Sequence, residues 1–413
     1  MEPGDFPAGK VSQGLAGVAS SEIVLGAQEE FNAGGTYHIS AAFLSATQFV
    51  AAYQDRADAN HGKARVGTVT GTAITFGAEA EFNAGVTYWN SAAALSPTQF
   101  VVAYEDQSYQ RRGRARAGTV SGTSITFGAV AEFRSTRSEG LQYISVAALS
   151  ATQFVVAYTD WHDSGDGRAK VGTVSGTSIT FGAEAEFRSA GQATHNSVAA
   201  LSPTQFVVAY TDWHDSGHGT AKVGTVSGTD VTFGAEAEFL SAGGATYNSV
   251  AALSATKFVV ACQDNFGAGH GTARVGTVTG TAIAFGAVAT FNSTGPANRI
   301  SVAVLSPTQF VAAYEDHTLP YKAPVIVGTV SGTSITFGAR TLFSSVISAS
   351  MSAVALSPTQ IVVAYDDNVN HGIAKVGTLP SGASLAASTP AAYGTAATTT
   401  KVAFCGWFRN PSA

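Results

Sequence analysis

Apolar and polar residues alternate along most of the chain in short runs of five to nine residues. Gly, Ser, Pro or Asn separates one run from the next, as expected where strands end in tight turns. The run AKVGTV at Ala221 to Val226 is an example, and its period of two is typical of a strand with one buried face. No window shows the 3.6-residue period of an amphipathic helix. The pattern therefore predicts an all-β protein with almost no helix.

The runs recur as copies of one repeat, and each copy opens on a Leu-Ser pair. Successive pairs are 51 to 54 residues apart, with the leucines at Leu44, Leu95, Leu149, Leu201, Leu253, Leu305 and Leu356. We predict four strands in a copy: a at Asn248 to Leu253, b at Gln205 to Tyr210, c at Ala221 to Val226 and d at Val231 to Phe239. Four antiparallel strands at a period of about 50 residues are typical of a β-propeller blade.

The number of blades depends on how the ring closes. Strand d of the last copy is degraded and contains Pro390, which cannot donate a ladder hydrogen bond. Glu22 to Phe31 matches strand d, so we predict that this N-terminal segment completes a seventh blade. The alternative is an eight-bladed ring, in which Thr398 to Phe408 pairs with Gly14 to Phe31.

The apolar residues shared by all copies are predicted to pack between blades. The second position of strand b is always large and apolar: Phe49, Phe100, Phe154, Phe206, Phe258, Phe310 and Ile361. Cys262 stands where the other copies have Tyr, so we expect it in the core. With Cys405 the only other cysteine, no disulfide framework is indicated.

Length and composition indicate one domain, because the repeat runs through almost all of the 413 residues. We assign 1–9 to a flexible arm, 10–393 to the propeller and 394–413 to a tail that is a candidate closing strand. Only 12% of residues are charged, the net charge is −6, and no basic run occurs, which argues against a nucleic-acid partner. No signal peptide and no apolar run of membrane-spanning length is found in the numbered chain.

The two faces of the predicted ring differ. The a–b and c–d turns are short and nearly constant, whereas the b–c and d–a connections on the other face vary. Variable loops on a rigid scaffold are where binding residues usually lie. Two residues before the Ser of strand a, the d–a connections place a ring of side chains: His38, Trp89, Tyr143, His195, Tyr247, Arg299 and Ser350. Trp161 and Trp213 stand in b–c loops, and four copies have a His-Gly pair before strand c, at His61, His218, His270 and His371.

An Asp ends strand b in every copy: Asp55, Asp106, Asp160, Asp212, Asp264, Asp316 and Asp367. Such carboxylates can ligate Ca²⁺ or sugars, or they can cap backbone N–H groups of the loop as Asx turns. Their regularity favours the capping role. The candidates for metal ligands are Asp160, Asp163, Asp212 and Asp215, and no other cofactor is indicated.

Exposed aromatic side chains beside Asp, His and Asn have the chemistry to stack on a sugar ring and to bond its hydroxyls. The alternative is local packing between loops. The candidate ligand-binding residues are His38, Trp89, Tyr143, Trp161, His195, Trp213, His218 and Tyr247. Motifs of nucleophile elbows, zinc hydrolases and phosphate loops are absent, so an enzyme is disfavoured, although a polysaccharide hydrolase or lyase assembled from distant loops stays open.

The motifs LSxTQFVVAYxD, AKVGTVSG and ITFGAEAEF cover about nine-tenths of the chain. They resemble the blade repeats of microbial, marine and phage-borne propeller proteins, a group similar to surface adhesins and propeller lectins. The resemblance implies a multivalent carbohydrate-binding or adhesive propeller, extracellular or at a cell surface, with glycans or cell-surface polysaccharide as partners. A structural scaffold with a protein partner or self-association is the alternative.

Overall fold

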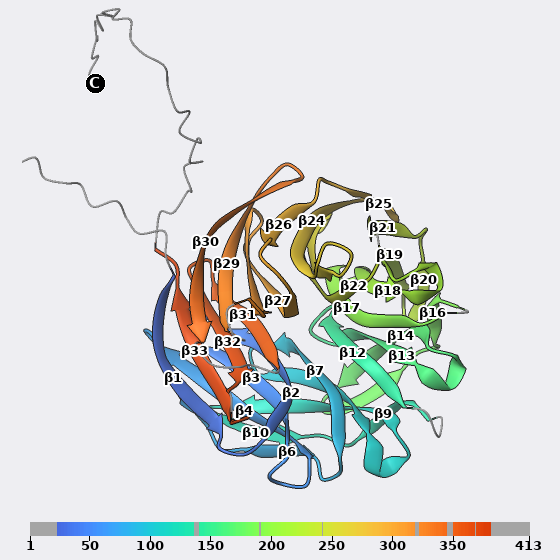
Figure 1. Ribbon diagram of the computed structural model, residues 1–413. Helices are drawn as coiled ribbons and strands as arrows, with labels where there is room; N and C mark the ends of the chain where they lie inside the picture. The colour runs from blue at the N-terminus through green and yellow to red at the C-terminus, as the bar shows by residue number, and fades with distance from the viewer. Residues whose placement is uncertain are drawn as a thin grey trace, which may run out of the picture. The chain divides into compact units, whose positions relative to one another are not determined.

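The computed structural model describes residues 23–135, 140–189, 191–241, 243–318, 322–344, 350–367 and 369–380. These residues form seven antiparallel sheets arranged as blades around a central axis (Figure 1). The only helical elements among them are three short 3₁₀ turns, η1 (Gln107–Tyr109), η2 (Trp161–Asp163) and η3 (Trp213–Asp215). None of the described helices could span a membrane. The all-β, seven-bladed prediction is confirmed.

Each blade has four strand positions, which we call first to fourth from the axis outwards. The first strands are β2 (Thr36–Ser45), β7 (Thr87–Ser96), β12 (Leu141–Ala148), β17 (Ala193–Ser202), β22 (Ala245–Ser254), β27 (Ala297–Ser306) and β31 (Met351–Ser357). The second are β3 (Gln48–Asp55), β8 (Gln99–Asp106), β13 (Gln153–Asp160), β18 (Gln205–Asp212), β23 (Lys257–Asp264), β28 (Gln309–Asp316) and β32 (Gln360–Asp366). The third are β4 (His61–Thr70), β9 (Arg112–Ser121), β14 (Asp166–Ser175), β19 (His218–Ser227), β24 (His270–Thr279), β29 (Ala323–Ser331) and β33 (Gly372–Thr378).

The fourth position differs from the prediction of one strand d, because five blades split it into two short strands. These pairs are β5 (Ala73–Phe76) with β6 (Ala80–Asn83), β10 (Ser124–Phe127) with β11 (Ala131–Arg134), β15 (Ser178–Phe181) with β16 (Ala185–Arg188), β20 (Asp230–Phe233) with β21 (Ala237–Leu240), and β25 (Ala282–Phe285) with β26 (Ala289–Asn292). In the fourth blade, Phe233 pairs with Gly224 and Ala237 pairs with Ala221. The outer segment therefore advances by four residues while β19 advances by three. The extra residue is a bulge that interrupts the strand. The sixth blade keeps one strand, β30 (Ser334–Ser344).

The ring closes through the two ends of the repeat. β1 (Val24–Asn32) pairs antiparallel with β33 and supplies the fourth strand of the seventh blade. In Figure 1 the blue strand β1 lies beside the red strand β33. The first strands contact one another around the ring, and β2 meets β31 where the circle closes. The predicted N-terminal closure is therefore confirmed, and the described sheets number seven rather than eight. The expected arm 1–9 and tail 394–413 lie outside the described residues.

The core lies between blades, as predicted. Phe206 is fully buried and packs with Val155 and Val171 of the preceding blade. The Gly of AKVGTV, Gly224, is required for a steric reason. A Cβ at this position would lie 2.2 Å from the Phe206 ring. Cys262 is buried and unbridged, and burial raises the pKa of its thiol to about 12.

A ring of serine hydroxyls links each first strand to its neighbour. Ser197 Oγ accepts a hydrogen bond of 3.0 Å from Val250 N of the next blade. The same bond recurs at the other six junctions, with acceptors Ser40, Ser91, Ser145, Ser249, Ser301 and Ser352. These backbone N–H groups of the first strands would otherwise lack a hydrogen-bond acceptor near the axis. The repeated Ser therefore has a structural function.

Candidate functional site

A cavity of about 550 Å³ lies at the centre of the ring, on the face that carries the b–c and d–a connections. It is lined by residues at or near the start of the seven first strands. The lining side chains are Tyr37, His38, Ile39, Trp89, Asn90, Tyr143, Ile144, His195, Asn196, Tyr247, Asn248, Arg299, Ile300, Ser350 and Met351. The predicted ring of side chains is thus brought to one place, and it forms one central cavity.

A β-bulge at the start of each of six first strands shapes the cavity wall. On β17, Thr194 pairs with Thr211 and Ser197 with Ala209, so one extra residue is inserted before Ser197. His195 falls within the bulge and has a φ of 52°. The six equivalent residues all have φ between 49° and 53°: His38, Trp89, Tyr143, His195, Tyr247 and Arg299. Bulky residues rarely adopt this left-handed conformation, and such strain concentrates at binding sites, where a bulge re-aims a side chain.

Five of these side chains form a continuous arc of rings around the cavity. Neighbouring ring centroids are 5.2 Å apart for His38 and Trp89, and 4.6 Å apart for Trp89 and Tyr143. The separation is again 4.6 Å from Tyr143 to His195, and it is 5.3 Å from His195 to Tyr247. All four pairs are tilted or edge-on, the geometries that aromatic quadrupoles favour.

The arc carries no charge at neutral pH. Burial lowers the pKa of His38 and of His195 to about 4, so both imidazoles are neutral. Burial also raises the pKa of Tyr143, which keeps its phenol protonated. Arg299 on the remaining side is ion-paired with Glu315, a carboxylate that is 1% exposed. The cavity is therefore an uncharged aromatic surface with a neutralised cation at one edge.

Three buried amides lie on the cavity wall next to the arc. Asn90, Asn196 and Asn248 are 7%, 8% and 8% exposed. Within the described part of the chain, both amide atoms of Asn90 and the Oδ1 atoms of the other two make no hydrogen bond. The Nδ2 of Asn196 donates to Thr159 Oγ1 at 2.9 Å, and that of Asn248 donates to Thr211 Oγ1 at 3.1 Å. Buried polar atoms are nearly always satisfied, so these atoms need a ligand or water in the cavity.

The amides were not among the sequence-predicted site residues. They follow the ring residue directly, at a position where other blades have Ile39, Ile144 and Ile300. This exchange of Asn for Ile is visible in the printed sequence, but alternation alone does not tell which face these residues line. The bulge decides it, and a bulge leaves no clear signal in a single sequence.

The other predicted ligand-binding residues lie away from the cavity wall. Trp213 in η3 is 45% exposed and donates from Nε1 to Thr194 Oγ1 at 2.7 Å. Trp161 occupies the same place in η2. His218 begins β19 and lies beside Asp215 and Glu238. The structure therefore brings together His38, Trp89, Tyr143, His195 and Tyr247, and it separates Trp161, Trp213 and His218 from them.

Six of the seven repeated Asp residues cap the b–c loops, whereas Asp106 makes no such bond and its Oδ2 accepts from Arg114 Nη1 at 2.7 Å. Asp212 Oδ1 accepts from His214 N at 3.1 Å, and Asp160 Oδ1 accepts from His162 N at 3.1 Å. The equivalent bonds occur at Asp55, Asp264, Asp316 and Asp367. This geometry is the Asx turn, which explains why the carboxylate recurs.

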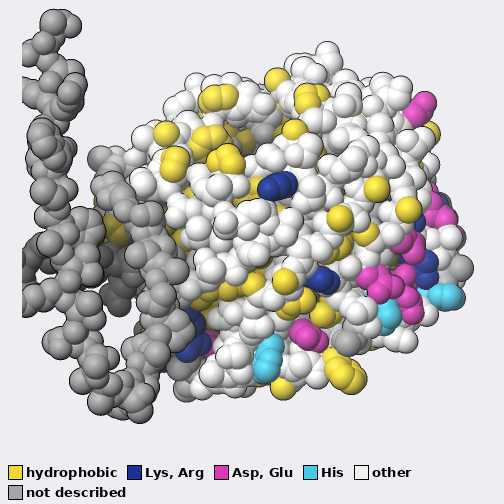
Figure 2. Space-filling view, turned by 90° about the horizontal axis from the view of Figure 1, so that it is seen from above, with side chains coloured by type: hydrophobic (Ala, Val, Ile, Leu, Met, Phe, Trp, Pro, Cys, Tyr) yellow, Lys and Arg dark blue, Asp and Glu magenta, His cyan; other side chains and the backbone are white. Residues whose placement is uncertain are grey.

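Arginines partner several of the metal candidates. Asp160 lies 2.5 Å from Arg134 Nη2, Asp163 lies 2.9 Å from the same atom, and Asp212 lies 3.1 Å from Arg188 Nε. Ligation of Ca²⁺ by these groups stays a prediction. On the face shown in Figure 2, histidines and acidic side chains gather along the lower and right-hand edge, while most of the surface is uncharged.

Comparison with protein-family models and with curated proteins gave no match. Solved structures do match. The lectin BP39L of Burkholderia pseudomallei is 12% identical, with a TM-score of 0.59 over 84% of this chain and 96% of that chain. Sqt1 of Chaetomium thermophilum, solved with the N-terminus of ribosomal protein L10, is 14% identical, with a TM-score of 0.51 over 84% and 88% of the two chains. At these identities the likeness shows a shared propeller fold, and the solved propellers similar to this chain include a lectin.

Proposed function

We propose that this protein is a non-catalytic, lectin-like propeller that binds carbohydrate in its central cavity. The observation that carries the proposal is the contact between an uncharged aromatic arc and three buried amides with unpaired atoms. A sugar ring has an apolar C–H face that stacks on aromatic side chains, and its hydroxyls both donate and accept. One ligand of this class therefore satisfies both parts of the wall.

The charge and size of the cavity favour a neutral sugar. His38 and His195 are neutral, and the Arg299 guanidinium already pairs with Glu315, so a carboxylate or sulfate on the ligand finds no free cation among these groups. A volume of about 550 Å³ lies within the usual range of about 300–1,000 Å³ for small-ligand sites. We propose a neutral mono- or short oligosaccharide, bound with a stoichiometry of one per chain. An extracellular or cell-surface location would follow from such a partner.

The test is a glycan-array screen of the full chain, followed by calorimetric titration with a sugar that binds. Trp89→Ala and Tyr143→Ala are expected to weaken binding at least tenfold, which corresponds to a loss of about 1.4 kcal/mol of stacking. Trp213→Ala is the matched control, because the Trp213 side chain lies outside the cavity. The sugar affinity of this variant should equal that of the wild type. Because six of the seven repeated Asp residues cap backbone groups, a chelator should leave binding unchanged.

Two results would contradict the central site. Several sugars bound per chain, with affinity lost in Trp213→Ala, would support the multivalent loop sites instead. A blank array would favour a protein partner, and a pull-down with wild-type protein and with Trp89→Ala would then show whether the cavity takes part.

A further inference from the structure

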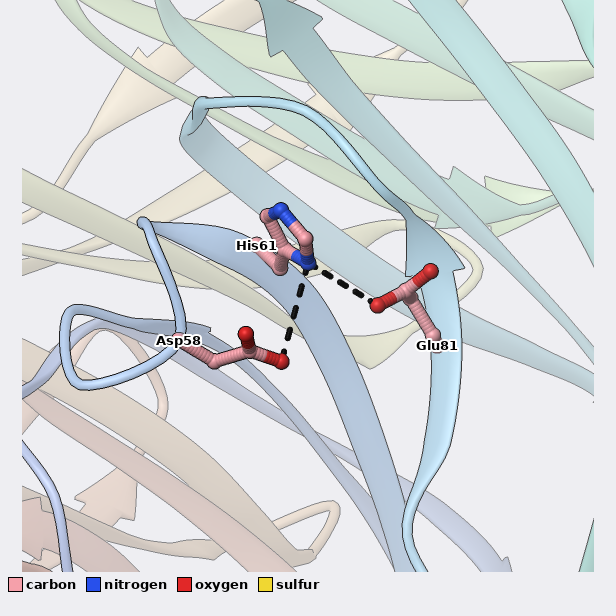
Figure 3. Close-up of side chains that lie close together, drawn as sticks. All are labelled: Asp58, His61 and Glu81. Carbon is pink, nitrogen blue, oxygen red and sulfur yellow. Dashed lines mark hydrogen bonds and ion pairs between the residues drawn. The ribbon is translucent and has the colours of Figure 1, made fainter.

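Two clusters of one histidine and two carboxylates lie outside the cavity, at equivalent positions in two blades. The first contains Asp58, His61 and Glu81, and Figure 3 shows both carboxylates beside the same ring nitrogen. The second contains Asp215, His218 and Glu238. In each, His opens the third strand, Asp stands three residues earlier in the b–c loop, and Glu lies on the outer strand. The ligand atoms of a cluster all lie within 4.8 Å of one another.

The first cluster already contains a cation of the protein. Lys63 Nζ lies 2.6 Å from Asp58 Oδ2 and 2.7 Å from Glu79 Oε1. His61 Nδ1 forms a 3.0 Å hydrogen bond with Glu81 Oε2. The ammonium and the imidazole thus satisfy the carboxylates, and a metal ion would have to displace Lys63.

The second cluster lacks this cation, because Thr220 replaces Lys63 at the same place on the third strand. His218 Nδ1 is buried and makes no hydrogen bond within the described residues. It lies 3.2 Å from Asp215 Oδ2 and 3.6 Å from Glu238 Oε1. A buried ring nitrogen is therefore aimed between two carboxylates without a hydrogen bond to either.

We propose that Asp215, His218 and Glu238 form a binding site for a first-row divalent cation of the Zn²⁺ type. Zn²⁺ takes His nitrogen and carboxylate oxygen in tetrahedral geometry, and bonds of about 2.0–2.1 Å place neighbouring ligand atoms about 3.3–3.4 Å apart. The separations of 3.2 and 3.6 Å around His218 Nδ1 agree with this spacing. Ca²⁺ prefers an all-oxygen site, so the histidine selects against it. Three protein ligands leave a fourth position for water or another ligand.

The test is calorimetric titration of the full, tag-free chain with ZnCl₂. The wild type is expected to bind one Zn²⁺ tightly. His218→Ala and Asp215→Asn should each weaken this binding by more than about 100-fold, because losing even a second-shell partner costs about 10–100-fold. Lys63→Thr should create a second strong site, at Asp58, His61 and Glu81.

The fifth blade supplies the matched control. His270 occupies the position of His218, but Gly267 and Thr290 stand where the carboxylates would be, so His270→Ala should leave Zn²⁺ affinity unchanged. Thermal unfolding of every variant without metal checks that the fold is intact, and Glu238→Gln replaces any variant that fails to fold. Wild-type protein that binds no Zn²⁺ at micromolar concentration, or binding that survives both His218→Ala and Asp215→Asn, would overturn the proposal.

Discussion

Replacing Asn90 with Ile should stabilise the propeller while it removes ligand binding. Asn90 is 7% exposed, and neither of its amide atoms has a hydrogen-bond partner within the described residues. Ile39, Ile144 and Ile300 occupy the same position in other blades and are each 7% exposed, so the local backbone accepts this side chain. The substitution therefore exchanges a poorly satisfied buried amide for a side chain that the scaffold already packs.

The expected gain follows from the cost of an unmade hydrogen bond, which is about 1–3 kcal/mol for each buried polar group. Asn90 has two such atoms, but solvent can enter an open cavity, which lowers the cost of leaving them without protein partners. We therefore expect the free energy of unfolding to rise by about 1–3 kcal/mol in total. Asn196→Ile should gain less, because it also removes the bond from Asn196 Nδ2 to Thr159 Oγ1.

The measurement is guanidinium-induced unfolding without ligand, in which a higher midpoint at unchanged slope reports greater stability. The reverse substitution, Ile144→Asn, serves as the control and should lower the midpoint. The reasoning is wrong if Asn90→Ile unfolds at lower denaturant than the wild type, because the amide would then be well satisfied in the unliganded protein. Glycan titration of the same variant separates the gain in stability from the loss of function.

Two further predictions concern the ring and the cavity. Ser197→Ala removes the acceptor of Val250 N and should cost about 1–2 kcal/mol of unfolding free energy, measured by the same unfolding assay; a neutral effect would mean that water replaces the hydroxyl. Because burial lowers the pKa of His38 and His195 to about 4, the unfolded state binds more protons than the folded state between about pH 6.5 and pH 4. Stability should therefore fall as the pH is lowered through this window, and a His38→Gln/His195→Gln double variant should show a flatter pH profile of the unfolding midpoint.

The fold can be predicted from the sequence because the same pattern of strands and turns occurs in every copy of the repeat. The strands around Phe206, the interblade core and the closure by an N-terminal strand, which the structure has at Val24–Asn32, could all be predicted from alternation and period. The bulge that splits the outer strand could not, since GAEAEF continues the alternating pattern across Gly234 and the lost pairing appears only in the register with β19.

The candidate site was predictable in part. The ring from His38 to Tyr247 stands out because the repeat varies there, and these residues lie together on one face, as the sequence predicts. Whether they act separately or together depends on the bulge at the start of six of the first strands, which turns them towards the axis. Trp213 attracts attention as an exposed aromatic residue, yet its indole bonds to Thr194 and lies apart from the cavity.

The central position of the cavity has a consequence for how such a chain changes over generations. Six repeats contribute a variable residue at the bulge to one shared opening, the seventh contributes Ser350, and nearly constant residues hold each blade to the next. Duplicating, deleting or exchanging whole repeats by recombination would reorder the residues around the opening and keep the junctions intact. Binding preference could therefore be rewritten by shuffling gene segments, without a single new point mutation in the scaffold.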